Sequence, residues 1–226
     1  MAPEFKLTPG QYLFPTPAGA YYAVSENVEE PARCMLFNLL LGASTRLATP
    51  AALAAWVGAA GEAEALEVLY RAQQLGWVQG EQRPRHMRGT TLESDSPALL
   101  GELSSEGCAL LSDVQGFYIS GSGFTHETAE ELALLAAELT QAVDRRAGVL
   151  RRNLGIAGGA WATVDAAGNS QLGVWPLCIG KFRFCLTLLG TPRFNREAFT
   201  ELVWMIVNRY GSGAGTWGRS ARVESL

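Results

Sequence analysis

The stretch from residue 106 to 155 constrains the fold most strongly, because it predicts two short strands followed by one long helix. Residues 108–112 and 117–120 are typical of antiparallel strands, and Asp-Val-Gln-Gly at 113–116 is typical of the tight turn between them. Thr125 then caps a helix whose first turns are acidic, as the helix dipole favours. Apolar residues recur there at helical spacing, so one stripe is expected to face a core: Leu132, Leu135, Ala136, Leu139, Val143, Leu150 and Leu154.

The composition indicates a soluble globular protein of one or two domains. Of 226 residues, 48% are hydrophobic and 18% are charged, which is ordinary for such proteins. The sequence contains no apolar run long enough to predict a membrane span, and its first residues do not resemble a signal peptide. The four cysteines lie singly in apolar runs, which predicts buried, reduced thiols and a cytoplasmic location.

The front of the chain predicts a compact helical unit. Residues 12–14 and 20–24 flank a Pro-Thr-Pro-Ala-Gly segment, which favours an opening hairpin. Three short helices are expected after Pro31, Pro50 and Gly61, and a strand is expected to begin at Trp77-Val78. This order is similar to that of a winged helix. The polar composition around residues 81–97 then predicts four segments: a winged-helix-like domain (1–90), a linker (91–97), a second domain (98–210) and a Gly/Ser-rich tail (211–226).

The second domain is predicted to continue beyond the long helix with three more strands and a last helix. A short helix at 98–103 precedes the first two strands. The later strands are expected at 160–164, 171–177 and 182–188, and Asn195 caps the final amphipathic helix. The predicted order is therefore helix, two strands, long helix, three strands, helix.

The run GCALLSDVQGFYISGSGFTHETAEELALLAAEL, residues 107–139, resembles the roadblock/dynein light-chain family. The resemblance extends over about residues 97–211 and implies an α+β fold. It implies a five-stranded antiparallel sheet with the long helix on one face and the terminal helices on the other. It also implies a homodimer joined through the third strand and the long helix, and a small Ras-like GTPase as protein partner.

Small and uncharged residues predict where such a dimer would be joined. Alanines and a threonine lie beside the leucine stripe of the long helix, although alanine is also simply the best helix former. The third strand has no proline or charge, which an exposed edge would need to avoid uncontrolled pairing. The predicted dimer interface is Ala133, Ala137, Thr140, Ala160, Trp161, Ala162, Thr163 and Val164.

DNA binding by the winged-helix-like domain is the alternative function. A reading helix would need cations, yet the expected third helix carries Glu62, Glu64 and Glu67. Residues 1–90 contain seven Lys/Arg and eight Asp/Glu, which would repel phosphate. The residues able to contact nucleic acid are Arg71, Arg83, Arg85 and Arg88. The sequence thus favours a protein-binding scaffold or regulator over a transcription regulator whose C-terminal domain dimerises or senses a ligand.

No catalytic residue, cofactor site or metal site is predicted. Residues 213–218 match G-x-G-x-x-G, but the dinucleotide fold needs a strand before these glycines and a helix precedes them here. The chain has only two histidines and no paired cysteines for a metal. No G-x-S-x-G elbow is present, so the sequence predicts a protein that is not an enzyme.

Overall fold

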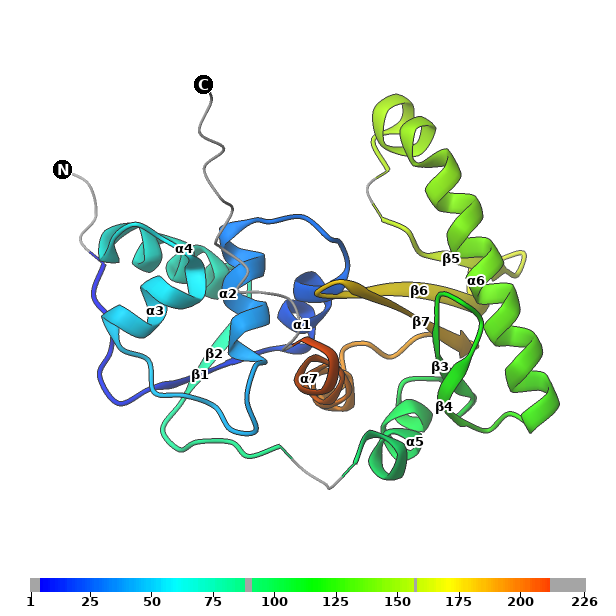
Figure 1. Cartoon of the computed structure of the whole chain (residues 1–226), viewed down its shortest axis with the longest axis horizontal. Helices are drawn as coiled ribbons and strands as arrows, with labels where there is room; N and C mark the ends of the chain where they lie inside the picture. The colour runs from blue at the N-terminus through cyan, green and yellow to red at the C-terminus, as the bar shows by residue number, and fades with distance from the viewer. Residues whose placement is uncertain (1–4, 88–90, 157, 212–226) are drawn as a thin grey trace.

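The computed structural model describes residues 5–87, 91–156 and 158–211. Figure 1 shows a helical front part beside a sheet that is crossed by one long helix. The sheet is antiparallel, five-stranded and ordered β4-β3-β7-β6-β5, which confirms the strands predicted for the second half of the chain. Its strands are β3 (Ala109–Asp113), β4 (Tyr118–Ser122), β5 (Trp161–Val164), β6 (Ser170–Ile179) and β7 (Phe182–Leu189).

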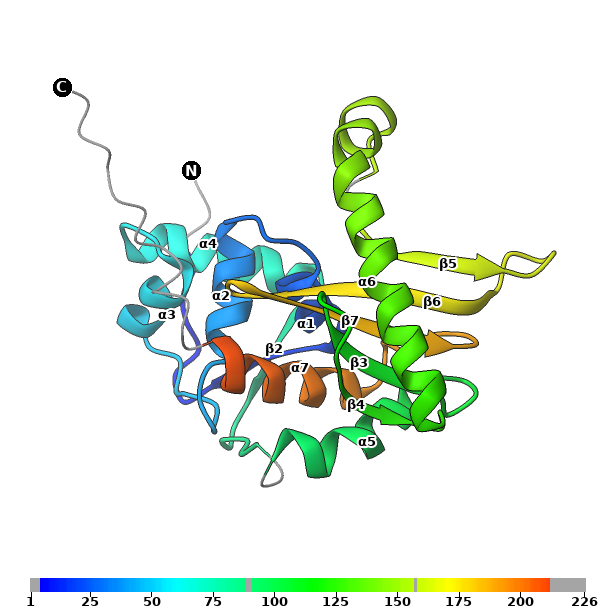
Figure 2. The ribbon, with the colours of Figure 1, turned by 45° about the vertical axis from the view of Figure 1, so that its right-hand side comes forward.

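Residues along β3 point alternately to the two faces of the sheet and show what covers each face. Leu110 packs with Ala129 and Ala133 of the long helix α6 (His126–Gly148). Its neighbour Leu111 belongs to the main core, which includes residues of α5 (Leu92–Glu102) and α7 (Glu197–Tyr210). Since adjacent strand residues face opposite ways, α6 covers one face and α5 and α7 cover the other, as Figure 2 shows.

The long helix lies on the sheet through small residues. Its buried residues are Ala129, Ala133, Ala136, Ala137 and Thr140. The prediction that the leucine stripe faces the core is wrong for Leu135, which is 40% exposed, and for Leu154, which is 61% exposed. Alanine lets the helix backbone approach the strands closely, so the longer side chains are left beside the contact. The helix continues into one π-helical turn, η1 (Val149–Asn153), and the chain then reaches Gly155.

The front part consists of β1 (Tyr12–Pro15), α1 (Pro17–Val24), α2 (Pro31–Leu39), α3 (Pro50–Val57), α4 (Glu62–Gln74) and β2 (Val78–Glu81). The three predicted helices are present as α2, α3 and α4. The predicted opening hairpin is wrong, because residues 20–24 are helical. Thr16 accepts a hydrogen bond from the amide of Gly19 and Pro17 occupies the first turn, so a helix starts there. The strand β1 pairs with β2 instead, antiparallel.

Helix α5 occupies most of the predicted linker. Residues 92–97 are helical, because the Thr91 side chain accepts a hydrogen bond from the Ser94 amide and caps the helix. Pro97 therefore lies inside the helix rather than near its start. The predicted helix at 98–103 exists but begins at residue 92, which is about two turns earlier at 3.6 residues per turn.

One hydrophobic core joins the front helices to α7. The rings of Phe14 and Trp204 lie 5.0 Å apart, and Trp204 Nε1 donates to the Gly42 carbonyl at 2.8 Å. Asn208 Nδ2 donates to the Leu40 carbonyl at 2.9 Å. Buried residues of both parts belong to the same cluster. The division of the chain into domains at residues 91–97 stays a prediction. The hydrophobic core is continuous across these residues.

Candidate protein-interaction surface

Strand β5 is the most exposed part of the sheet. It lies at the edge of the strand order and, among the residues that the structure describes, pairs only with β6 and has no strand along its other backbone edge. All its residues are exposed, and Trp161 and Val164 are 48% and 57% exposed. The strand therefore has one open edge and neither face covered. It carries neither charge nor proline, two of the usual protections of an edge strand, but it is short and its pairing with β6 is irregular between Thr163 and Val164.

Further apolar side chains are exposed in the segment that leads into β5. Val149 and Leu154, at the end of the long helix, are 51% and 61% exposed. Ile156, in the loop that follows, is 49% exposed. Figure 1 shows this end of the helix projecting beyond the sheet, on the side from which the chain returns to β5. Exposed apolar residues clustered in this way are typical of a surface that another protein covers.

The structure separates the predicted dimer-interface residues into two groups. Residues 160–164 are all exposed and lie together on β5 and just before it. Ala133, Ala137 and Thr140 have exposed fractions of 0%, 4% and 2%, and their place in a dimer interface stays a prediction. These three face the chain's own sheet, where the Thr140 hydroxyl lies 3.3 Å from the Cys185 sulfur. No partner can contact them without displacing the helix.

The residues that α6 does expose were missed by the sequence analysis. Leu134 is 55% exposed and Leu135 is 40% exposed, so both remain available to a partner. Phe117, in the turn between β3 and β4, is 68% exposed. The signal was present in the sequence, since alanines at 129, 133, 136 and 137 recur at helical spacing and form a face of their own. That face packs on the sheet, and the leucines adjoin it.

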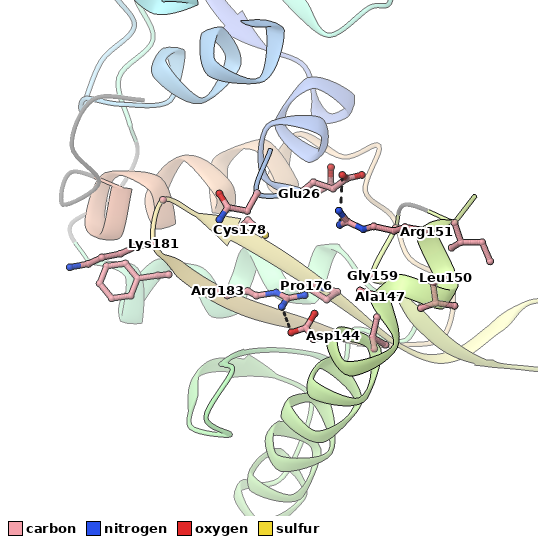
Figure 3. A pocket seen from close by; sticks show the side chains of 17 residues that line it. Glu26, Asp144, Ala147, Leu150, Arg151, Gly159, Pro176, Cys178, Lys181 and Arg183 are labelled. Carbon is pink, nitrogen blue, oxygen red and sulfur yellow. Dashed lines mark hydrogen bonds and ion pairs between the residues drawn. The ribbon is translucent and has the colours of Figure 1, made fainter. Parts of the chain in front are cut away.

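A polar cleft of about 260 Å³ lies where the loop after α1 meets the end of α6 and the β6–β7 hairpin (Figure 3). Its two arginines are paired with carboxylates from other elements. Arg183 Nη1 lies 2.5 Å from Asp144 Oδ2, and Arg151 lies 3.9 Å from a Glu26 oxygen. Burial raises the pKa of the Cys178 thiol in its wall, so this thiol stays protonated and is a poor nucleophile. The arrangement ties elements together and offers no activated group.

The arginines of the alternative DNA-binding function are largely engaged. Arg71 pairs with Glu67 at 2.5 Å, an i,i+4 pair on α4. The Arg85 guanidinium bonds Glu81 and Glu197 and lies 4.8 Å above the Phe14 ring. These two carboxylates raise its pKa and neutralise its charge. Arg83 is exposed, and Arg88 lies outside the described residues.

Metal and membrane features are absent from the described residues. Within 5–87, 91–156 and 158–211, no three His, Cys, Asp or Glu side chains come together in a way that could hold a metal ion. His126 instead hydrogen-bonds Tyr118, with 2.6 Å between its Nδ1 and the hydroxyl oxygen. No helix in the same ranges is both long and apolar enough to cross a bilayer. The G-x-G-x-x-G sequence at 213–218 and the rest of the predicted tail beyond Gly211 lie outside these ranges.

The fold and the exposed strand define a mixed α/β protein with a five-stranded antiparallel sheet and a surface suited to protein contacts. No family model and no curated protein matches the sequence. Among solved structures, Myxococcus xanthus MglB is 17% identical with a TM-score of 0.35, over 53% of this chain and 97% of that one. A roadblock/LC7 domain from Streptomyces avermitilis is 18% identical with a TM-score of 0.32, over 51% and 88%.

A third solved structure, MglB with a tetrameric arrangement, is 16% identical with a TM-score of 0.37, over 57% of this chain and 96% of that one. The structural neighbours are thus roadblock/LC7 domains and MglB, and each covers about half of this chain. Since all three TM-scores lie below 0.5, the likeness carries no conclusion about what this chain binds or how it assembles.

Proposed function

We propose that this protein is a non-enzymatic homodimeric scaffold or regulator of the cytoplasm, and that two copies join through β5. The observation that supports it is the exposure of β5 along one edge and on both faces. Two such strands pairing edge to edge would satisfy the open backbone groups and extend the sheet across both subunits. Trp161 and Val164 would lose water, at a gain of about 25 cal/mol per Å² of apolar area buried.

The partner of this dimer is proposed to be a small Ras-like GTPase, as the sequence resemblance to the roadblock family implies. The exposed leucines of α6 and Phe117 supply apolar area beyond β5 for such a contact. In this proposal the front helices form the winged-helix-like unit and contact protein rather than DNA. The ion pairs of Arg71 and Arg85 and the acidic start of α4 support that choice, because phosphate binding needs unneutralised cations.

Sedimentation measures the proposed dimer directly. At micromolar concentration the unmodified chain should sediment as a dimer. Ala162→Asp places an uncompensated carboxylate at the proposed seam, so this variant should sediment as a monomer or aggregate. Ala63→Asp is the matched control, because Ala63 is exposed on α4, away from β5, and should leave the dimer intact. A monomeric unmodified chain would overturn the proposal.

DNA binding remains the second candidate function and rests on the exposed Arg83. Mixing the whole chain with random duplex DNA at physiological salt should give no complex tighter than the non-specific range of about 10⁻⁴ to 10⁻⁶ M. A nanomolar affinity that depends on the DNA sequence, and that Arg83→Ala lowers, would reverse the ranking of the two functions.

A further inference from the structure

The end of the long helix is left uncovered by the rest of the described chain. From Arg145 to Ile156 only Ala147 and Leu150 are half-buried, and the other residues are exposed. Figures 1 and 2 both show this end projecting beyond the sheet. We call residues 145–156 the helix tip. Helices in proteins are held mainly by the packing of one face, so an uncovered end is available to a further surface.

The helix tip carries a concentrated positive charge. No acidic residue occurs between Asp144 and Asp165. The chain as a whole has a formal charge of −4, and four of its positive charges lie in the helix tip, so the rest of the chain carries −8. An anionic surface would therefore attract this end of the molecule and repel the remainder. The four positive charges belong to Arg145, Arg146, Arg151 and Arg152.

Most of these arginines are not neutralised by a carboxylate. Arg151 lies 3.9 Å from a Glu26 oxygen, which is a long contact between two side chains. The carboxylate that precedes the helix tip, Asp144, is already bound by Arg183 at 2.5 Å. Among the described residues, the other three arginines of the helix tip are exposed and have no ion-pair partner: Arg145, Arg146 and Arg152.

Apolar side chains lie among these arginines. Val149, Leu154 and Ile156 are 51%, 61% and 49% exposed. The helix dipole accounts for cations near a helix C-terminus, but it does not account for apolar side chains left in water. A nucleic-acid backbone would attract the arginines alone, and leucine and valine are under-represented among the side chains that dominate protein contacts. The boundary of an anionic bilayer accepts both kinds of side chain.

We propose that the helix tip binds the surface of an anionic lipid bilayer. Its guanidinium groups donate hydrogen bonds to the phosphates of the lipid headgroups, which they can contact in pairs. Val149, Leu154 and Ile156 enter the boundary between the headgroups and the acyl chains. The contact is peripheral and needs no helix that crosses the bilayer. It does not depend on the proposed dimer, which is joined through β5.

Flotation of the whole chain with lipid vesicles tests this inference. Vesicles of phosphatidylcholine and phosphatidylglycerol in equal parts should bind the chain on the order of 100-fold more tightly than vesicles of phosphatidylcholine alone. The reason is that each of the three unpaired arginines contributes about fivefold near an anionic surface. High salt should weaken this binding, because it screens exposed charges.

Two variants separate the contribution of charge from that of apolar contact. The double variant Arg145→Gln/Arg146→Gln should weaken binding to the anionic vesicles about 25-fold, at about fivefold for each arginine. Leu154→Ser keeps the charge and should weaken the same binding at least about threefold, because less apolar area leaves water. All three residues are exposed, so both variants should keep the circular dichroism spectrum of the unmodified chain.

The double variant Arg193→Gln/Arg196→Gln is the matched control. Both residues are exposed, and they precede α7, which covers the face of the sheet opposite α6. This variant makes the same change of charge and should bind anionic vesicles within about twofold of the unmodified chain, because salt screens distant charges.

Three results would overturn the proposal. Equal binding of the unmodified chain to neutral and anionic vesicles would do so, and would leave the helix tip to an acidic protein. Binding to anionic vesicles that Arg145→Gln/Arg146→Gln leaves unchanged would place the contact elsewhere on the molecule. Binding that depends on the arginines but not on Leu154 would show attraction to any polyanion, without contact with the bilayer boundary.

Discussion

Two aspartates close the hairpin turns of the sheet in the same way. Asp113 Oδ1 accepts the amides of Gln115 and Phe117, and Asp165 Oδ1 accepts those of Ala167 and Asn169. Each turn then needs a glycine with positive φ, +95° at Gly116 and +86° at Gly168. The Asp-x-x-Gly pattern was sufficient to predict the turn at 113–116 from sequence, and the turn at 165–168 repeats it, because side chain and backbone requirements coincide within four residues.

The two turn glycines should differ in their tolerance of a side chain. Gly168→Ala should lower the free energy of unfolding by about 1–2 kcal/mol, the cost of a Cβ in this backbone region, since nothing lies within 4 Å of the new atom. Gly116→Ala should cost about 1 kcal/mol more, because its Cβ would lie 2.7 Å from Leu134 Cδ2 and force that side chain off its rotamer. Urea unfolding of both variants measures the difference. Equal losses would show that Leu134 moves aside freely.

At the scale of elements, prediction succeeded where one local signal determined the outcome. The strands at 108–112 and 117–120 were placed within two residues, and the Thr125 cap was correct. Residues 20–24 were misassigned because a proline-rich segment favours turns and helix starts alike, and Thr16 with Pro17 favoured the helix. Which face of α6 packs on the sheet could not be decided from apolar spacing, since alanines and leucines occupy adjoining stripes.

Arginine substitutions should distinguish the two stripes of α6. Ala137→Arg places a guanidinium between helix and sheet, where Ala137 is 4% exposed, and should cost at least about 3 kcal/mol of unfolding free energy. Leu135→Arg, at a residue 40% exposed, should change the same quantity by less than about 1 kcal/mol. Thermal unfolding followed by circular dichroism measures both. A stable Ala137→Arg variant would contradict the packing of α6 described here.

At the scale of the whole molecule, the relation between the two halves could not be predicted. The polar stretch at 81–97 has the composition of a linker, yet Leu92, Ser96 and Leu100 are buried. Contacts between Phe14 and Trp204, or between Gly42 and Asn208, join residues far apart in sequence that no local pattern indicates. For β5, the sequence indicated only that a strand without charge or proline could form an interface. It did not indicate that this strand would be exposed at the edge of the sheet.

The proposed scaffold should act on a GTPase without supplying a catalytic arginine. Arg145, Arg146, Arg151 and Arg152 follow one another at the end of α6, where the helix dipole favours cations, and Arg151 lies near Glu26. Replacing any one of them with alanine should change the GTPase's hydrolysis rate by much less than the roughly 10³-fold effect of an arginine finger. Single-turnover hydrolysis with binding measured in parallel is the assay. A loss of that size with binding intact would identify a catalytic role.

The shared core between the front helices and α7 also bears on how such a protein can be inherited. A gene fusion that transferred only residues 98–210 would carry Phe199, Leu202 and Trp204 without the front side chains that now cover them. The transferred piece would expose these apolar side chains to water. The fused protein would then aggregate and would be selected against. Gene rearrangements should therefore not separate the chain at residues 91–97. The front helices and the sheet should be inherited as one unit.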